Sequence, residues 1–394
     1  MPGREEKEML ISKEEMKKRY ELGRQIMKEN HLEAIFLIGD YMPGDELSGD
    51  FQYFVNNYIM YRRHCVLMFP NQEPTLISGG WVQTENAKKN CWIDDCRAVG
   101  SDTEFFNKIA DILVEKKIEK GAVGTNTYYV SMAIQQILKD KIPGISLVDV
   151  HRDIMRLRMH HSKGEMDIIR RCCEIADGAY EHIIPFIKPG ITQNELRGEL
   201  DNFMISKGAE NTFTCVSTGV YSTDPSRNTL QLTHVPLADF KTVKENDTVW
   251  LEITPQFDGY WGQLVRLVSV SQQNDELEEV SQFVQAAIEA AEEEIRPGNT
   301  VGQMVRTMRK RFASYTDRYQ IGSNVGHICG LDLTDAPIDD DSELEMVVGM
   351  AMIIHPSVLT PDGAGEVFFG ETYMVTEDGC ERLMKADYQI SVVN

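Results

Sequence analysis

Hydrophobic positions in the first 150 residues fall into two alternating patterns, short apolar runs and stretches with helical spacing. Apolar runs lie at 34–39 (AIFLIG), 65–69 (CVLMF) and 75–78 (TLIS), with shorter strand-like runs near 121–124 and 146–149. Helical spacing covers 13–30, 103–117 and 129–140, and Ser12 and Glu15 have the spacing of a capping box before the first of these. Strands that alternate with helices in this way predict an α/β domain with a central sheet.

The pattern changes at residues 150–162, where VHRDIMRLRMHHS is basic and shows no strand alternation. A second capping-box pair, Ser162 and Glu165, follows directly. We therefore predict two domains, residues 1–155 and residues 156–394.

The second half shows helices separated from a group of strands. Helical spacing covers 163–184, the segment opened by Thr192 and Glu195, 275–295 and 300–313. Strand patterns lie near 211–220, 247–256, 260–270, 323–333, 349–355 and 366–375, with a tight turn at Asp258–Gly259. This arrangement predicts an α+β domain built on a twisted antiparallel sheet.

Composition narrows the classes of protein that fit. The chain has 394 residues, 42% hydrophobic and 26% charged, and no run of apolar residues reaches the roughly 18 that a membrane helix needs. The N-terminus, MPGREEKEML, lacks the apolar segment of a signal peptide, and the eight cysteines have no framework spacing, so we expect a cytoplasmic protein. A net charge of −22 disfavours nucleic acid and anionic membranes as partners and leaves a small-molecule substrate.

Five polar residues stand out because each lies in or beside an apolar strand pattern. They are Glu252, Gln263, His327, His355 and Glu371. Burying such groups costs free energy unless they are paired, hydrogen-bonded or bound to metal, so we expect them to converge on one site. His234, in QLTHVPLADF, is a sixth candidate.

These residues and their flanks resemble the pita-bread family of methionine aminopeptidases, prolidases and creatinases. KPGITQNEL resembles the family's PGxTExEL turn, and GMAMIIHPSVL resembles its GMxxxxEPG strand. ETYMVTEDGCERL resembles the last catalytic strand, EDxxxVTExGxExL. The resemblance implies a pita-bread catalytic domain preceded by a smaller creatinase-type N-terminal α/β domain.

Metal-dependent members of the family hold two metals with two aspartates, a histidine and two glutamates. Carried over, these positions fall on Glu252, Gln263, His327, His355 and Glu371. An amide cannot bridge two cations, and the ligand set loses two negative charges, at Gln263 and His355. The resemblance therefore argues against a dinuclear aminopeptidase site.

Three interpretations remain open. In the first, the site holds no metal and hydrolyses a C–N bond in a small polar or zwitterionic molecule, as creatinase does, with His234, His327, Glu252 and Glu371 as catalytic groups. In the second, His327, His355 and Glu371 hold one divalent metal (Fe, Mn or Zn) for hydrolysis or for lyase chemistry like that of dimethylsulfoniopropionate lyase. In the third, the chain is a non-catalytic binding module with the same fold.

We favour the first interpretation, with Gln263 and His355 as substrate-binding groups. Creatinase-like members are homodimers in which the small domain of one subunit supplies an arginine to the substrate carboxylate of the other. Arg62 and Arg63, in IMYRRHCVLM, are the candidates for that role, and a homodimer is expected.

Overall fold

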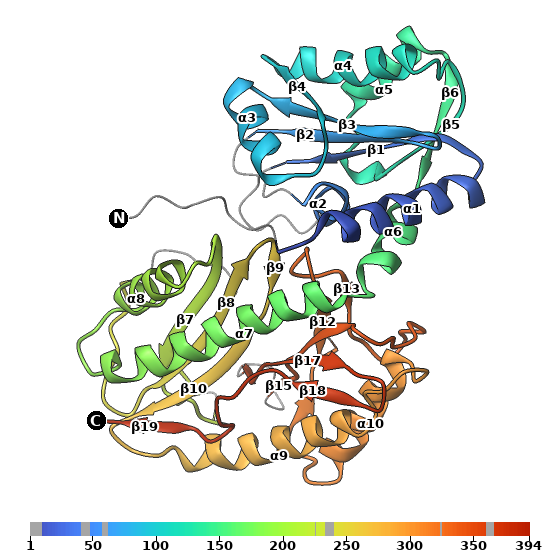
Figure 1. Cartoon of the computed structure of the whole chain (residues 1–394). Coiled ribbons are helices and arrows are strands. Elements are labelled where there is room, and N and C mark those ends of the chain that lie inside the picture. Colours follow the sequence, from blue (N-terminus) through green and yellow to red (C-terminus); the bar gives the residue numbers. More distant parts are fainter. Residues whose placement is uncertain are drawn as a thin grey trace. The chain divides into compact units, whose positions relative to one another are not determined.

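The computed structural model describes residues 10–40, 48–56, 62–224, 226–232, 240–323, 325–359 and 366–394. The chain divides into two compact units, Met1–Arg158 and Met159–Asn394, and each is described by itself (Figure 1).

The first unit is built on a six-stranded mixed sheet with the order β4-β3-β2-β1-β5-β6. Its strands are β1 (Leu32–Gly39), β2 (His64–Phe69), β3 (Gln72–Gly79), β4 (Asp95–Val99), β5 (Lys120–Thr125) and β6 (Gly144–Asp149). The strand β2 pairs antiparallel with both β1 and β3. The other pairings, β3 with β4, β1 with β5 and β5 with β6, are parallel. The predicted α/β domain is confirmed.

Helices cover both faces of this sheet. The helices α4 (Asp102–Glu115) and α5 (Met132–Lys141) pack their apolar faces into a core with residues such as Phe36, Leu67 and Val123. The helices α1 (Lys13–Glu29), α2 (Gly49–Val55) and α6 (His151–Arg158) lie on the other side (Figure 1). A further helix, α3 (Trp81–Asn90), connects β3 to the edge strand β4.

The described residues of the second unit form three sheets, in which the strands pair antiparallel except for β10 and β19, which are parallel. The first has the order β19-β10-β8-β7, with β9 paired to β8, the second β13-β12-β14-β17-β18, and the third β11-β15-β16. The strands are β7 (Asn211–Gly219), β8 (Thr248–Phe257), β9 (Tyr260–Trp261), β10 (Leu264–Val270), β11 (Gln320–Ile321), β12 (Gly326–Cys329), β13 (Ala336–Pro337), β14 (Ala351–Ile354), β15 (Ser357–Leu359), β16 (Glu366–Phe368), β17 (Glu371–Val375), β18 (Cys380–Arg382) and β19 (Ser391–Val393).

Four long helices accompany these sheets among the described residues: α7 (Lys163–Ile183), α8 (Gln193–Ser206), α9 (Asp275–Glu292) and α10 (Val301–Ala313). Both capping boxes predicted for α7 and α8 are formed, because Ser162 and Thr192 each accept from the backbone of the glutamate three residues on. In the parts of the chain that the structure describes, no helix is long and apolar enough to cross a membrane.

The hairpin predicted at Asp258–Gly259 connects β8 to β9. Asp258 and Gly259 have φ of 49° and 87°, and Phe257 pairs directly with Tyr260. Positive φ at both central residues is the geometry of a two-residue type I′ turn, whose twist matches that of the flanking strands. The turn fixes the register of the chain that leads from β8 to Gln263.

Candidate active site

Glu252 and Gln263 lie side by side in the second unit. Glu252 is in the middle of β8, and Gln263 directly precedes β10, which pairs antiparallel with β8. Gln263 Nε2 donates a 2.9 Å hydrogen bond to Glu252 Oε1, and both side chains are buried. The amide therefore turns its donor side toward the carboxylate.

The backbone of Gln263 is held from the second sheet. The hydroxyl of Thr372 accepts from Gln263 N at 3.0 Å and donates to Gln263 O at 2.9 Å. On the other side of β8, Cys215 of β7 pairs with Glu252. Burial and then the charge of Glu252 raise the pKa of the Cys215 thiol, so this sulfur is a neutral neighbour of the carboxylate.

His327 and His355 form a second pair. His327 lies in β12, and His355 directly follows β14, the strand that pairs with β12. Their ring centroids are 5.1 Å apart, and the ring of His355 also lies 5.3 Å from that of Phe368. Burial, and then the neighbouring His355, lower the pKa of His327 to about 3, so its imidazole is neutral at pH 7.

The two pairs are joined through Val265 and Gly370. Val265 pairs with Glu252 across the first sheet, and Val265 and Gly370 exchange backbone hydrogen bonds of 3.1 and 3.2 Å. A Cβ added to Gly370 would lie 2.5 Å from Val265 Cγ2 and 3.3 Å from His355 Cβ. Position 370 therefore faces Val265 and His355, and Val265 fills the space that a side chain there would need.

Glu371, predicted as a catalytic or metal-binding group, lies apart from this cluster, so the structure does not bring it together with the other four predicted residues. Its carboxylate binds Arg266, and Arg382 donates to it at 2.9 and 3.1 Å. The strand register explains the direction of the Glu371 side chain. Thr372 pairs with Ile353, which pairs with His327, so these three side chains share one face of the sheet. Glu371 pairs instead with Ile354. Successive residues of a strand point to opposite faces, so Glu371 faces away from His327.

The sequence contained a signal for this placement of Glu371. In the motif EDxxxVTE, the glutamate stands five positions before the valine, and here that valine is Val375. Counting back places the motif's glutamate on Gly370 and its aspartate on Glu371. Glu371 is thus a structural carboxylate, and Arg266, which is fully buried, also donates to the backbone carbonyls of Val265 and Gly370.

The other predicted residues lie elsewhere. His234 falls outside the described residues. Arg62 and Arg63 belong to the first unit, where Arg63 donates to Asp40 at 2.6 Å and lies 3.6 Å from Asp102. Arg62, Arg63 and the two aspartates line a cavity of about 340 Å³ in that unit. The predicted contact of the two arginines with a substrate carboxylate stays a prediction.

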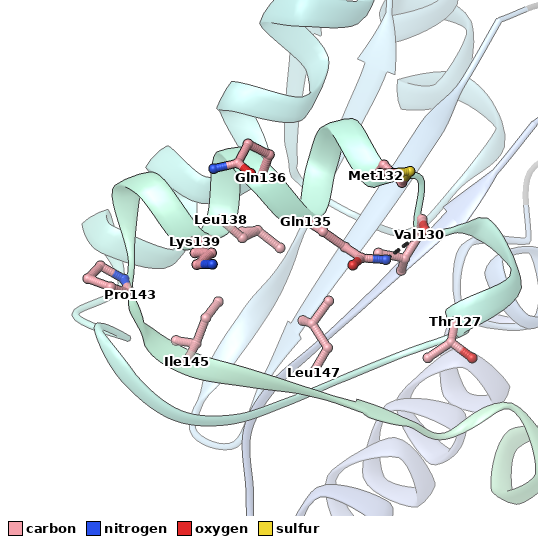
Figure 2. Close-up of a pocket in the computed structure, with 10 residues that line it drawn as sticks. All are labelled: Thr127, Val130, Met132, Gln135, Gln136, Leu138, Lys139, Pro143, Ile145 and Leu147. Carbon is pink, nitrogen blue, oxygen red and sulfur yellow. Dashed lines mark hydrogen bonds between the residues drawn. The ribbon is translucent and has the colours of Figure 1, made fainter.

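A second cavity of the first unit, of about 650 Å³, lies between α5 and β6 (Figure 2). Leu138, Ile145 and Leu147 point into it, and the amide of Gln135 bends back to donate to the carbonyl of Val130 at 3.3 Å. This lining is mostly apolar and contains no carboxylate or histidine, so we assign the chemistry to the cluster of the second unit.

The fold and this cluster define the class of protein: a pita-bread domain preceded by a creatinase/prolidase-type N-terminal domain. Residues 19–160 match the creatinase/prolidase N-terminal domain, and residues 167–377 match metallopeptidase family M24. The chain belongs to metallopeptidase family M24. The predicted family and fold are confirmed.

Several known proteins are similar to this chain. An uncharacterized peptidase, YqhT, of Bacillus subtilis is 28% identical over 241 residues, which are 60% of this chain and 65%, just under two thirds, of YqhT. A Xaa-Pro dipeptidase of Pyrococcus furiosus is 27% identical over 72% of this chain and 78% of its own length. The structure of a Xaa-Pro dipeptidase from Bacillus anthracis superposes with a TM-score of 0.80 over 96% of this chain and 100% of that chain, at 22% identity.

Members of this family use divalent metals, but the donor set of this chain does not fit one. Gln263 directs an N–H group at Glu252, where a cation would require an oxygen. The carboxylate of Glu371 is bound to two arginines, and position 370 has no side chain. Within the described ranges, no three His, Cys, Asp or Glu side chains form a group that could hold a metal ion. The proposed single-metal set of His327, His355 and Glu371 is therefore not assembled.

Proposed function

We propose that this protein hydrolyses a C–N bond in a small polar substrate by acid–base chemistry that does not depend on a metal held by the predicted ligands. The observation that carries the proposal is the hydrogen bond from Gln263 Nε2 to Glu252 Oε1. Two positions that the family resemblance implies as metal ligands are here bonded to each other. Membership in a family of peptidases, and relatives named as Xaa-Pro dipeptidases, support a hydrolase over a binding module.

Glu252 is the general base in this proposal. Its carboxylate takes a proton from water as the water oxygen attacks the carbon of the C–N bond, and it later returns that proton to the leaving nitrogen. Gln263 donates to one carboxylate oxygen and so fixes the orientation of the group. The opposing thiol of Cys215 is neutral, which keeps a second negative charge away from the base.

His327 acts as a neutral hydrogen-bonding group. With a pKa of about 3 it is a weak base at pH 7, but a neutral imidazole in a buried site can donate to an atom that gains negative charge during reaction. His355, half-buried beside it, binds the substrate in this proposal.

The test is steady-state turnover of Xaa-Pro dipeptides and of small amide and guanidino zwitterions, with and without a chelator. Glu252→Gln should lower kcat at least about 100-fold with little change in KM, because general bases typically contribute that much. The matched control is Glu381→Gln, which removes a surface carboxylate paired with Arg170 and should leave kcat unchanged.

Two results would overturn the proposal. Full kcat in Glu252→Gln would remove Glu252 as the base. Activity that is lost on chelation and restored by Mn²⁺, Fe²⁺ or Zn²⁺ would show that a metal carries the chemistry despite the altered donors.

The homodimer is also part of the proposal, with Arg62 or Arg63 of one subunit binding the substrate carboxylate at the other's site. Light scattering should give twice the chain mass of 44.8 kDa. An Arg62→Ala, Arg63→Ala double variant should raise KM for carboxylate substrates and leave KM for their amides unchanged.

A further inference from the structure

Two cysteines of the first unit, Cys91 and Cys96, lie together at the edge of the sheet. Cys91 is the residue that directly follows α3, and Cys96 lies in the edge strand β4 beside Leu76 of β3. The connection between α3 and β4 is short and covers only residues 91–94.

Both sulfurs contact the same acceptor. Cys96 Sγ donates to the carbonyl of Ile93 at 3.2 Å, and Cys91 Sγ donates to the same oxygen at 3.9 Å. A hydrogen bond from Cys96 also lowers the pKa of Cys91, against the effect of burial. The same hydrogen bond, and then burial, raise the pKa of Cys96, so the two thiols are adjacent and the thiolate is favoured on Cys91.

The two sulfurs differ in their exposure to solvent. Cys91 is buried and Cys96 is partly exposed at the sheet edge. The loop between them is anchored, because the indole N–H of Trp92 donates to Ile11 O at 3.0 Å. An anchored loop keeps the two sulfurs near each other and leaves one of them open to a small reagent.

We propose that Cys91 and Cys96 form a reversible disulfide, which makes this loop a site of oxidative modification by small disulfides such as glutathione disulfide. Cys96 passes its proton to the Cys91 thiolate as its sulfur attacks one sulfur of glutathione disulfide, whose S–S bond breaks, and the released glutathione thiolate takes that proton from Cys91. The Cys91 thiolate then attacks Cys96 Sγ and displaces the second glutathione. Two protein thiols are oxidised, and one glutathione disulfide is reduced to two glutathiones.

The test uses the full native chain in buffers of graded glutathione and glutathione disulfide, followed by acid quench, alkylation and trypsin. Cleavage after Lys89 and Arg97 releases one peptide, residues 90–97, that carries both cysteines. Oxidation should yield this peptide without alkyl groups and about 2 Da lighter than the dithiol, and dithiothreitol should reverse it. Cys91→Ser and Cys96→Ser should each abolish the lighter peptide.

Cys380 is the internal control, because it is also partly exposed but its sulfur contacts the carbonyl of Glu292 at 3.8 Å. It should form at most a mixed disulfide with glutathione. The proposal is overturned if residues 90–97 stay doubly alkylated in excess glutathione disulfide, or if the lighter peptide forms only after urea unfolds the chain.

Discussion

Buried His327 should make the stability of the second unit fall as the pH is lowered below neutrality. Its pKa is about 3 in the folded protein against an ordinary value of 6.5. The unfolded chain therefore binds a proton below about pH 6.5 that the folded chain does not bind until about pH 3. Stability from this group is fully present above pH 6.5 and is lost progressively between these two values.

The size of the effect follows from the same two values. At roughly 1.36 kcal/mol per pH unit, the full loss is about 5 kcal/mol at pH 3, of which about 2 kcal/mol is already lost at about pH 5. Replacing the imidazole by an amide of similar size, in His327→Gln, removes this titration. The difference in unfolding free energy between the two proteins should therefore change by about 2 kcal/mol between about pH 7.5 and pH 5.

Two measurements check this. Urea unfolding followed by tryptophan fluorescence, for both proteins at each pH, gives the difference in unfolding free energy. Carbon-13 labelling of the histidines gives the titration of His327 directly, with its signal assigned by the variant. A His327 signal with a midpoint near pH 6, or parallel stability profiles for the two proteins, would refute the reasoning.

Three further predictions concern the residues around the site. Glu371→Ala leaves buried Arg266 without its partner and should cost roughly 3–5 kcal/mol in urea unfolding, whereas a loss below 1 kcal/mol would contradict a structural ion pair. Gly370→Ala should destabilise by roughly 1–3 kcal/mol through contact with Val265, and a double-mutant cycle should show that Val265→Ala relieves it; strict additivity would rule this out. Thr372→Val loses the two hydrogen bonds that its hydroxyl makes with the backbone before β10, so it should cost roughly 1–3 kcal/mol and lower kcat, while Thr372→Ser should keep both.

The elements that the sequence predicted well are those with local signals. Ser162 and Thr192 open helices with capping boxes, and Asp258–Gly259 makes the turn that its residue types favour. The short helix α2 escaped prediction because all seven of its residues are buried, so it has no polar face to mark its period. The edge strand β4, DCRAV, escaped because it is polar and only partly buried.

The sequence indicated which predicted site residues lie side by side, but not the sheet face toward which each side chain points. Glu252 and Gln263 are adjacent because the spacing of a hairpin places them so, and His327 and His355 follow from neighbouring strands. The direction of Glu371 depends on pairing with Ile354 and on Arg266, contacts between residues far apart in sequence. A one-residue error in the alignment of a strand reverses the face of every side chain, which is why a buried carboxylate could be mistaken for a ligand. The contact of Cys91 and Cys96 matches no recognised cysteine spacing, so only the fold brings it to light.

The contact between Val265 and Gly370 also constrains how this protein can change over generations. A glutamate introduced at position 370 would meet Val265 Cγ2 at its first side-chain carbon and would also need space for the rest of its side chain, so this single substitution should destabilise the fold more than Gly370→Ala does. A smaller residue at position 265 has to come first, and alone it brings no benefit, since it only opens a gap between the sheets. The order of the two substitutions therefore matters: a carboxylate at position 370 should be compatible with a well-packed fold only after position 265 has become smaller.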